Sequence, residues 1–227
     1  MSLFAVARLI AAKDLRIEWR SRIVLHQVVP FSGLVMVLFA FALDNDATLT
    51  RVAPGLVWLA SMFSMLVVVQ RSFAVEAADG ALDALRVAGV RPDGIFLGKS
   101  LALAAQLAVL EVILLLAAVV LYKADVGAGS VPLLLATFVA ATLGLAFVGT
   151  LYGGLASGAS GRETLLPLLM LPVVAPVLIG ATRATEAALG TNGASSNEGW
   201  PWVGLMVLFG VLFGAGGTLA FGSLVDE

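Results

Sequence analysis

The sequence contains no cysteine and only one histidine. Without thiols the chain cannot form a disulfide, a thiolate metal site or a cysteine nucleophile, and one imidazole cannot build a histidine-based metal cluster. It also lacks a glycine-rich phosphate loop of the GxxxxGKS/T type and any HExxH, paired-aspartate or Ser/His constellation. We therefore expect a protein that is not an enzyme, binds no metal or cofactor of its own, and leaves ATP to a separate chain.

Charge is scarce as well, because only 12% of the residues are charged whereas 60% are hydrophobic, and the mean hydropathy is +1.04. A soluble domain of 227 residues cannot hide that much apolar surface, so the bilayer must be the solvent. The formal net charge of -2 gives no reason to expect a nucleic acid partner.

Six stretches are long and apolar enough to cross a hydrocarbon core, which takes about 20 helical residues. We predict an all-α membrane protein in which a single transmembrane domain covers residues 23–227. The predicted spans are Ile23–Leu43, Val52–Val69, Lys99–Tyr122, Val131–Tyr152, Thr164–Ala181 and Trp202–Phe221.

Basic residues orient this bundle, because lysine and arginine collect in cytoplasmic segments. The N-terminal segment contains five of them, the connection 71–98 contains three with Lys99 directly after it, and the connection 158–163 contains Arg162, whereas the opposite connections contain only Arg51, Lys123 and Arg183. We therefore expect both termini on the cytoplasmic side of a bacterial inner membrane. The outer connection 182–199 is predicted to be the longest on its side and mobile, because it contains a run of small polar residues.

Residues 1–22 are predicted to form a separate amphipathic helix. Their charges interrupt any apolar core of a cleavable signal peptide, and apolar residues such as Phe4, Leu9 and Trp19 alternate with basic ones at roughly helical spacing. This pattern indicates a helix lying in the membrane surface with its basic residues toward lipid headgroups. The alternative is a helix that folds against another subunit.

The connection 71–98 is the longest on the inner side, yet it is too short for a catalytic domain. We predict that it forms a short amphipathic helix, parallel to the membrane, that docks a cytosolic partner, and the short connection 158–163 is a candidate for the same surface. The alternative is a solvated connector. The residues expected to make the contact are Phe73, Glu76, Asp79, Gly80, Leu82, Asp83, Leu85 and Arg86.

Polar residues inside the predicted spans are candidate sites because they are costly in lipid. Glu111 lies well inside the third span, where it lines a substrate path, bonds to another helix or serves as a structural glutamate. Gln106 lies five positions earlier and points about 140° away on an ideal helix, so the two are not expected to share a site. His26 is a candidate haem contact, although a lone histidine at a span end is more often interfacial. Three prolines predict a kinked or broken fifth span, either static, moving or re-entrant.

Three segments in chain order resemble the CcmB family, the haem exporter protein B group of the type-2 ABC permeases. They are Ala53–Ala60 (APGLVWLA), Asp79–Leu85 (DGALDAL) and Leu165–Ile179 (LLPLLMLPVVAPVLI). The resemblance covers most of the chain. It implies a type-2 ABC permease fold in which two copies of this chain pair with two copies of a CcmA-like ATPase, and in which the inner connection is the coupling helix.

The resemblance further implies a role in cytochrome c maturation, with haem as a substrate. Expected partners are a CcmC-like haem-handling membrane protein, a CcmD-like small membrane subunit and a CcmE-like periplasmic haem chaperone. Other functions stay open: a permease that exports a lipid, drug or polysaccharide, a scaffold that does not transport, or a proton-driven transporter that uses Glu111.

Overall fold

The computed structural model describes residues 2–43, 45–78, 80, 84–85, 87–124, 127–157 and 162–225. All regular structure in these ranges is helical. The long helices are α1 (Leu3–Ser21), α2 (Val29–Ala42), α3 (Asp46–Ala78), α5 (Pro92–Tyr122), α6 (Val131–Ser157), α7 (Arg162–Leu189) and α8 (Ser196–Val225). A π-helical turn, η1 (Val24–Val28), precedes α2, and two 3₁₀ turns, η2 (Ala128–Ser130) and η3 (Thr191–Gly193), precede α6 and α8.

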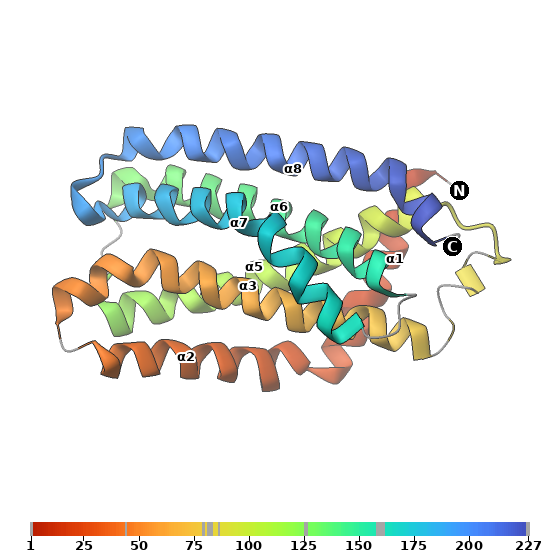
Figure 1. Ribbon diagram of the computed structural model, residues 1–227, viewed down its shortest axis with the longest axis horizontal. Coiled ribbons are helices and arrows are strands. Elements are labelled where there is room, and N and C mark those ends of the chain that lie inside the picture. Colours follow the sequence, from red (N-terminus) through yellow and green to blue (C-terminus); the bar gives the residue numbers. More distant parts are fainter. Residues whose placement is uncertain are drawn as a thin grey trace.

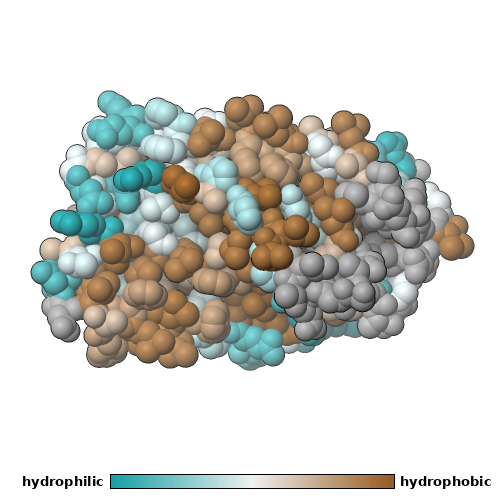
Figure 2. Space-filling model, in the orientation of Figure 1, coloured by the Kyte–Doolittle hydropathy of each residue, from teal (hydrophilic) through white to brown (hydrophobic). Residues whose placement is uncertain are grey.

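Within the described residues, six segments are long and apolar enough to cross a membrane, which confirms the all-α membrane class. They are Val24–Ala42, Asp46–Glu76, Pro92–Tyr122, Val131–Ala156, Pro167–Leu189 and Ser196–Gly222. These helices run along the long axis of the bundle, and both termini lie at the end that also holds residues 87–91 (Figure 1). Hydrophobic side chains cover much of the middle of the visible face, and hydrophilic ones gather toward its left end (Figure 2).

Two connections are shorter than predicted because the helices extend into them. Since α3 continues to Ala78 and α5 begins at Pro92, the predicted connection 71–98 shrinks to 79–91. On the opposite side, α7 runs to Leu189 and α8 begins at Ser196, so the prediction of a long loop over 182–199 is wrong. Alanines with high helix propensity and an Arg183–Glu186 pair at helical spacing extend α7 through most of that segment.

The bundle packs around α5, which contacts α1, α2, α3, α6 and α8. Phe96, near the start of α5, lies against Phe147 of α6 and Phe221 of α8, with ring centroids 6.0 and 5.6 Å away. Gly217 leaves room for that ring, because a Cβ there would lie 2.1 Å from it. This aromatic cluster fixes the N-terminal part of α5 against the C-terminal half of the chain.

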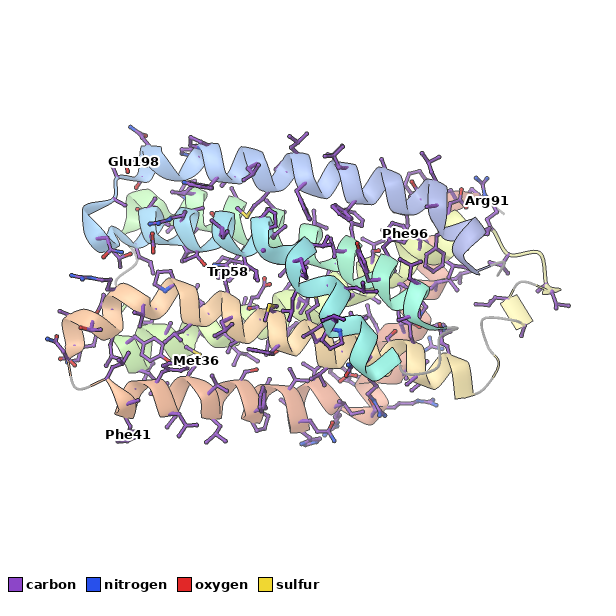
Figure 3. All side chains as sticks on the ribbon, viewed as in Figure 1. Met36, Phe41, Trp58, Arg91, Phe96 and Glu198 are labelled. Atoms are coloured by element: carbon purple, nitrogen blue, oxygen red, sulfur yellow. The ribbon has the colours of Figure 1, made fainter. Side chains whose placement is uncertain are left out.

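Hydrogen bonds link the helices nearer the other end. Trp58 Nε1 donates to Thr185 Oγ1 of α7 at 2.9 Å, and the Tyr122 hydroxyl donates to the Met36 carbonyl at 2.7 Å. Figure 3 shows Trp58 and Met36 turned into the bundle, whereas Phe41 points away from it and is 82% exposed. Such outward-facing apolar side chains suit a surface solvated by lipid.

Helix α7 is kinked but continuous. Pro167, Pro172 and Pro176 all lie inside it, and each removes a backbone donor and opens the helix locally. Figure 1 shows its N-terminal part bent away from the direction of its C-terminal part. The predicted kink is therefore confirmed, whereas a broken or re-entrant fifth span is not found.

Candidate functional site

Four charged side chains from three helices meet at the end of the bundle that holds the two termini. Lys99 of α5 places its Nζ 3.2 Å from Asp14 Oδ2 of α1 and 2.7 Å from Glu76 Oε2 of α3. Lys13 of α1 pairs with Asp14 Oδ1 at 2.9 Å and also with Glu76. We call Lys13, Asp14, Glu76 and Lys99 the ion cluster.

The ion cluster is largely removed from solvent. The side chains of Lys99, Glu76 and Asp14 are 2%, 4% and 8% exposed, and only Lys13 is half-buried. Burial lowers the pKa of Lys13, but its hydrogen bonds to Asp14 and Glu76 and their negative charge together outweigh burial, so that the pKa is raised above its usual value. Two cations and two anions balance here, which is the condition for burying charge at tolerable cost.

Lys99 is the centre of this arrangement because it has further partners on α3. Its Nζ lies 3.3 Å from Ser72 Oγ and 4.6 Å from the centroid of the Phe73 ring, a cation–π distance. Phe73 in turn packs against α6, where a Cβ on Gly153 would lie 2.5 Å from the ring. Lys99 therefore connects α5 to α1 and α3 directly, and to α6 through Phe73.

Two glycines of α5 bring α1 close enough for these ion pairs. A Cβ on Gly98 would lie 2.6 Å from the Ala7 carbonyl oxygen, and one on Gly94 would lie 2.7 Å from Val6 Cγ1. The buried face of α1 consists of Val6, Ala7, Ile10, Ala11 and Asp14. Asp14 thus continues an apolar stripe at helical spacing, which carries its carboxylate into the contact with α5.

A small cavity with both polar and apolar lining residues lies between α1 and α3 beside the ion cluster. Its volume is about 40 Å³, which is room for one or two waters. Asp14 and Glu18 of α1, Ser72 and Glu76 of α3 and Gln106 of α5 are among the residues that line it. Glu18 also holds the elbow that leads into α2, because its Oε1 accepts a 2.7 Å hydrogen bond from the Val24 backbone N–H.

The predicted docking residues divide into three groups. Phe73 and Glu76 are buried in α3: Glu76 belongs to the ion cluster and Phe73 lies beside it. They therefore do not face outward, although an outward-facing surface was expected of them. Gly80 and Leu85 lie in the connection 79–91 itself. The remaining residues, Asp79, Leu82, Asp83 and Arg86, lie outside the described residues, as does most of the connection 158–163.

The described part of the connection 79–91 has helical character. The Ala84 N–H donates to the Gly80 carbonyl and the Ala88 N–H to the Ala84 carbonyl, both at 3.0 Å. Gly89 has φ of +67° and the Val90 N–H reaches back to the Leu85 carbonyl, a geometry that ends helices. Leu85 packs against the core, whereas Val87 is 91% exposed. The connection therefore presents an apolar side chain to its surroundings.

The polar residues predicted inside the spans lie apart from one another. Glu111 is fully buried and accepts a hydrogen bond from the Thr142 hydroxyl of α6, while its Oε1 has no hydrogen-bond partner among the described residues. Gln106 faces the cavity at α3 instead. His26 is exposed in η1, and the described residues include no group of three or more His, Cys, Asp or Glu suited to a metal.

Sequence reasoning missed Lys13, Asp14 and Lys99 as members of a site. The sequence predicts Lys99 at the start of a span and the N-terminal charges in the membrane surface. Two features of the sequence could have indicated the site. Lys99 lies two turns inside a helix of apolar and small residues, where a lysine needs a partner, and Asp14 lies four positions after the apolar Ile10. Neither signal identifies the partner, because Lys99 and Asp14 are 85 residues apart in the chain.

Comparison with known proteins agrees with this architecture. The profile of the CcmB protein family matches residues 5–220. The chain is 30% identical to Heme exporter protein B of Paracoccus denitrificans over 183 residues, which cover 79% of this chain and 83% of that protein. It is 32% identical to Heme exporter protein B of Bradyrhizobium diazoefficiens, over 71% and 72% of the two chains, and 28% identical to that of Shigella flexneri, over 91% and 90%. On the match over nearly the whole chain, this protein belongs to the CcmB protein family.

Proposed function

We propose that this chain is the membrane-spanning permease subunit of an ABC transporter complex that works in cytochrome c maturation. The observation that supports this most directly is the family match over residues 5–220, together with six apolar spans that occupy the same region. Relatives that cover most of the chain carry the name Heme exporter protein B. The cargo of the complex is haem, either exported or released with its periplasmic carrier.

ATP binding and hydrolysis belong to a separate CcmA-like subunit, with two copies of each chain in the complex. The other partners are a CcmC-like haem-handling membrane protein, a CcmD-like small subunit and a CcmE-like periplasmic chaperone. Both termini and the connection 79–91 face the cytoplasm, because the segments at that end are rich in lysine and arginine. The ATPase therefore meets this chain at that end, in a type-2 ABC arrangement.

The connection 79–91 is the surface that couples the chain to the ATPase. It contains a helical turn, it exposes Val87, and it lies between the buried residues Glu76 of α3 and Gly94 of α5. Within the domain 23–227, Gly80 and Leu85 belong to this surface, and Phe73 and Glu76 support it from below.

Helix α1 packs on another helix of its own chain and also has an exposed amphipathic face. One face packs on α5, and the opposite face exposes Phe4 and Trp19, both 80% exposed, together with Arg8, Arg16 and Arg20. Exposed aromatic and basic side chains of this kind favour the boundary between hydrocarbon and headgroups. We place α1 in the inner membrane surface, bound to α5 through the face that contains Val6, Ile10 and Asp14.

The test is affinity purification of the tagged chain from native membranes in mild detergent, with partners identified by mass spectrometry and ATPase activity measured. Recovery of an ABC ATPase with haem-maturation proteins is the expected result. Recovery without any ATPase contradicts the permease assignment, and an ATPase whose activity responds to a lipid or drug but not to haem or its chaperone contradicts the haem assignment.

Two variants make the test of coupling specific. Val87→Glu places a charge on the exposed apolar side chain of the connection, and we expect less ATPase to be recovered and activity to be lost. Ala47→Glu adds the same charge at an exposed position in the first turn of α3, at the opposite end of the bundle. This control is expected to behave like the parent, and an equal loss in both variants contradicts a coupling role for the connection.

A further inference from the structure

The ion cluster contains residues from both helices that border the connection 79–91. Glu76 lies just before the end of α3 at Ala78, and Lys99 lies about two turns after the start of α5 at Pro92. Nζ of Lys99 and Oε2 of Glu76 are 2.7 Å apart. The two ends of the connection are therefore joined to each other by a buried ion pair.

The same cluster attaches α1 to this pair of helices, but in two different ways. Against α5, α1 packs closely over Gly94 and Gly98, so that contact is mainly apolar. Toward α3, a cavity lies between the helices, and the direct ionic contact of α1 is Lys13 with Glu76, while Asp14 is connected to α3 through Lys99 of α5. The direct link from α1 to α3 is thus ionic, and the cavity lies beside it.

An ionic link of this kind fixes position more strictly than apolar packing does. Apolar surfaces can slide past one another with little change in buried area, whereas a buried charge that leaves its partner becomes uncompensated at high cost. If the inner ends of α3 and α5 move together, Lys99 and Glu76 must take Asp14 and Lys13 with them or lose their balance of charge.

We propose that Lys13, Asp14, Glu76 and Lys99 are positioning residues that join α1 to the two helices bordering the connection 79–91, so that a displacement of the connection is passed on to α1. Lys99 is central, because it contacts both acids and, through Phe73, the α6 helix. The inference rests on the proposed function in one respect, because the partner ATPase supplies the displacement.

The absence of cysteine allows a direct test, since introduced thiols are the only ones in the chain. Spin labels are attached at exposed positions in two pairs, Ala12→Cys with Asn197→Cys for α1 and Val87→Cys with Asn197→Cys for the connection. Asn197 lies in the first turn of α8, at the opposite end of the bundle, and serves as the fixed reference. Labelled chain is diluted with unlabelled chain, and distances are measured by pulsed electron paramagnetic resonance on the whole complex, with and without a non-hydrolysable ATP analogue.

In the parent chain we expect both distances to change when the analogue binds. In Glu76→Gln/Lys99→Gln, which removes one charge of each sign and leaves Lys13 paired with Asp14, the 87–197 distance still changes and the change in the 12–197 distance falls to within measurement error. If this variant does not assemble, Lys13→Gln/Asp14→Asn provides the same test, because it removes both charges of α1 from the ion cluster and keeps the Glu76–Lys99 pair. Asp46→Asn/Lys123→Gln neutralises an exposed ion pair at the other end and is expected to preserve both changes.

The outcomes separate the two proposals. If both distances still change in the cluster variants, the proposed link between the connection and α1 is wrong, while the proposed function stands. The same holds if the connection moves in the parent chain and α1 does not. If the ATPase is bound and neither distance in the parent chain responds to nucleotide, both the proposed function and the proposed link between the connection and α1 are wrong.

Discussion

The two ends of the bundle are held together by different kinds of contact. At the end that holds the two termini, which is the inner end in the proposed orientation, α1, α3 and α5 meet through four charges, three of them buried, beside a small cavity. At the outer end, the Trp58–Thr185 and Tyr122–Met36 hydrogen bonds are neutral and buried, and the ion pair between Lys123 and Asp46 is exposed at 71% and 70%. Breaking a neutral hydrogen bond leaves no uncompensated charge, whereas each charge of the ion cluster is stabilised only while its partners stay in place. The inner end is therefore the part of the molecule where a small displacement has a large energetic effect.

Lys99→Met should produce the largest loss of stability. It leaves the carboxylates of Asp14 and Glu76 with the half-buried Lys13 as their remaining cation in the cluster, and an uncompensated buried charge costs about 3–5 kcal/mol. The measurement is thermal or denaturant unfolding in detergent. The triple variant Asp14→Asn/Glu76→Gln/Lys99→Met removes the stranded acids and should recover part of the loss; a Lys99→Met protein as stable as the parent contradicts the importance of the cluster.

Gly98→Ala should have the next largest effect, because it separates α1 from α5 without changing any charge. The new methyl group would lie 2.6 Å from the Ala7 carbonyl oxygen and from Ile10 Cβ, and overpacking of this kind costs about 1–3 kcal/mol. We expect lower stability and faster proteolysis within α1. Gly216→Ala in α8, where a Cβ has nothing within 4 Å, is the matched control; equal effects at both positions would mean that close contact is not the cause.

Tyr122→Phe tests the outer end with a smaller expected effect. It removes the hydroxyl that donates to the Met36 carbonyl and keeps the ring, so the free energy of unfolding should fall by about 1 kcal/mol. A loss as large as that of Lys99→Met would remove the contrast between the two ends.

Asp46→Asn/Lys123→Gln should have the smallest effect. Both side chains are mostly exposed, and exposed ion pairs contribute about 0–1 kcal/mol because water and salt screen them. Unfolding curves that overlap those of the parent are expected, and a clear loss would show that charge at the outer end is also structurally important.

The sequence was sufficient for the architecture because long apolar runs have few alternative structures in lipid. All six spans were located from hydropathy, and the kink in α7 followed from its three prolines. The helix ends were less predictable, since charged and small residues continue α3 and α5 beyond the apolar runs. Polar composition alone suggested a loop where Ala184, Ala187 and Ala188 in fact bury against the bundle.

The candidate site was the part that sequence reasoning could locate only approximately. The region around Phe73 and Glu76 was singled out, but as a surface rather than as part of the interior. The Lys99–Asp14 contact depends on how α1 folds back, which Gly94 and Gly98 permit by close approach. No local pattern in the chain specifies that contact, because both partners have side chains that are ordinarily solvated.

Because α5 is long, the thickness of the bilayer affects where the ion cluster lies relative to the hydrocarbon. From Tyr122 at the outer end, Lys99 lies about 35 Å along the helix axis, compared with a hydrocarbon core of about 30 Å. With Tyr122 at the outer boundary of the hydrocarbon, four charges at that depth would stand among headgroups in an ordinary membrane, and a thicker membrane would draw them toward hydrocarbon. Hydrophobic mismatch would then act on the ion cluster before it acted on any apolar contact, so the lipid composition of the host membrane would help to set how firmly the N-terminal helix is held.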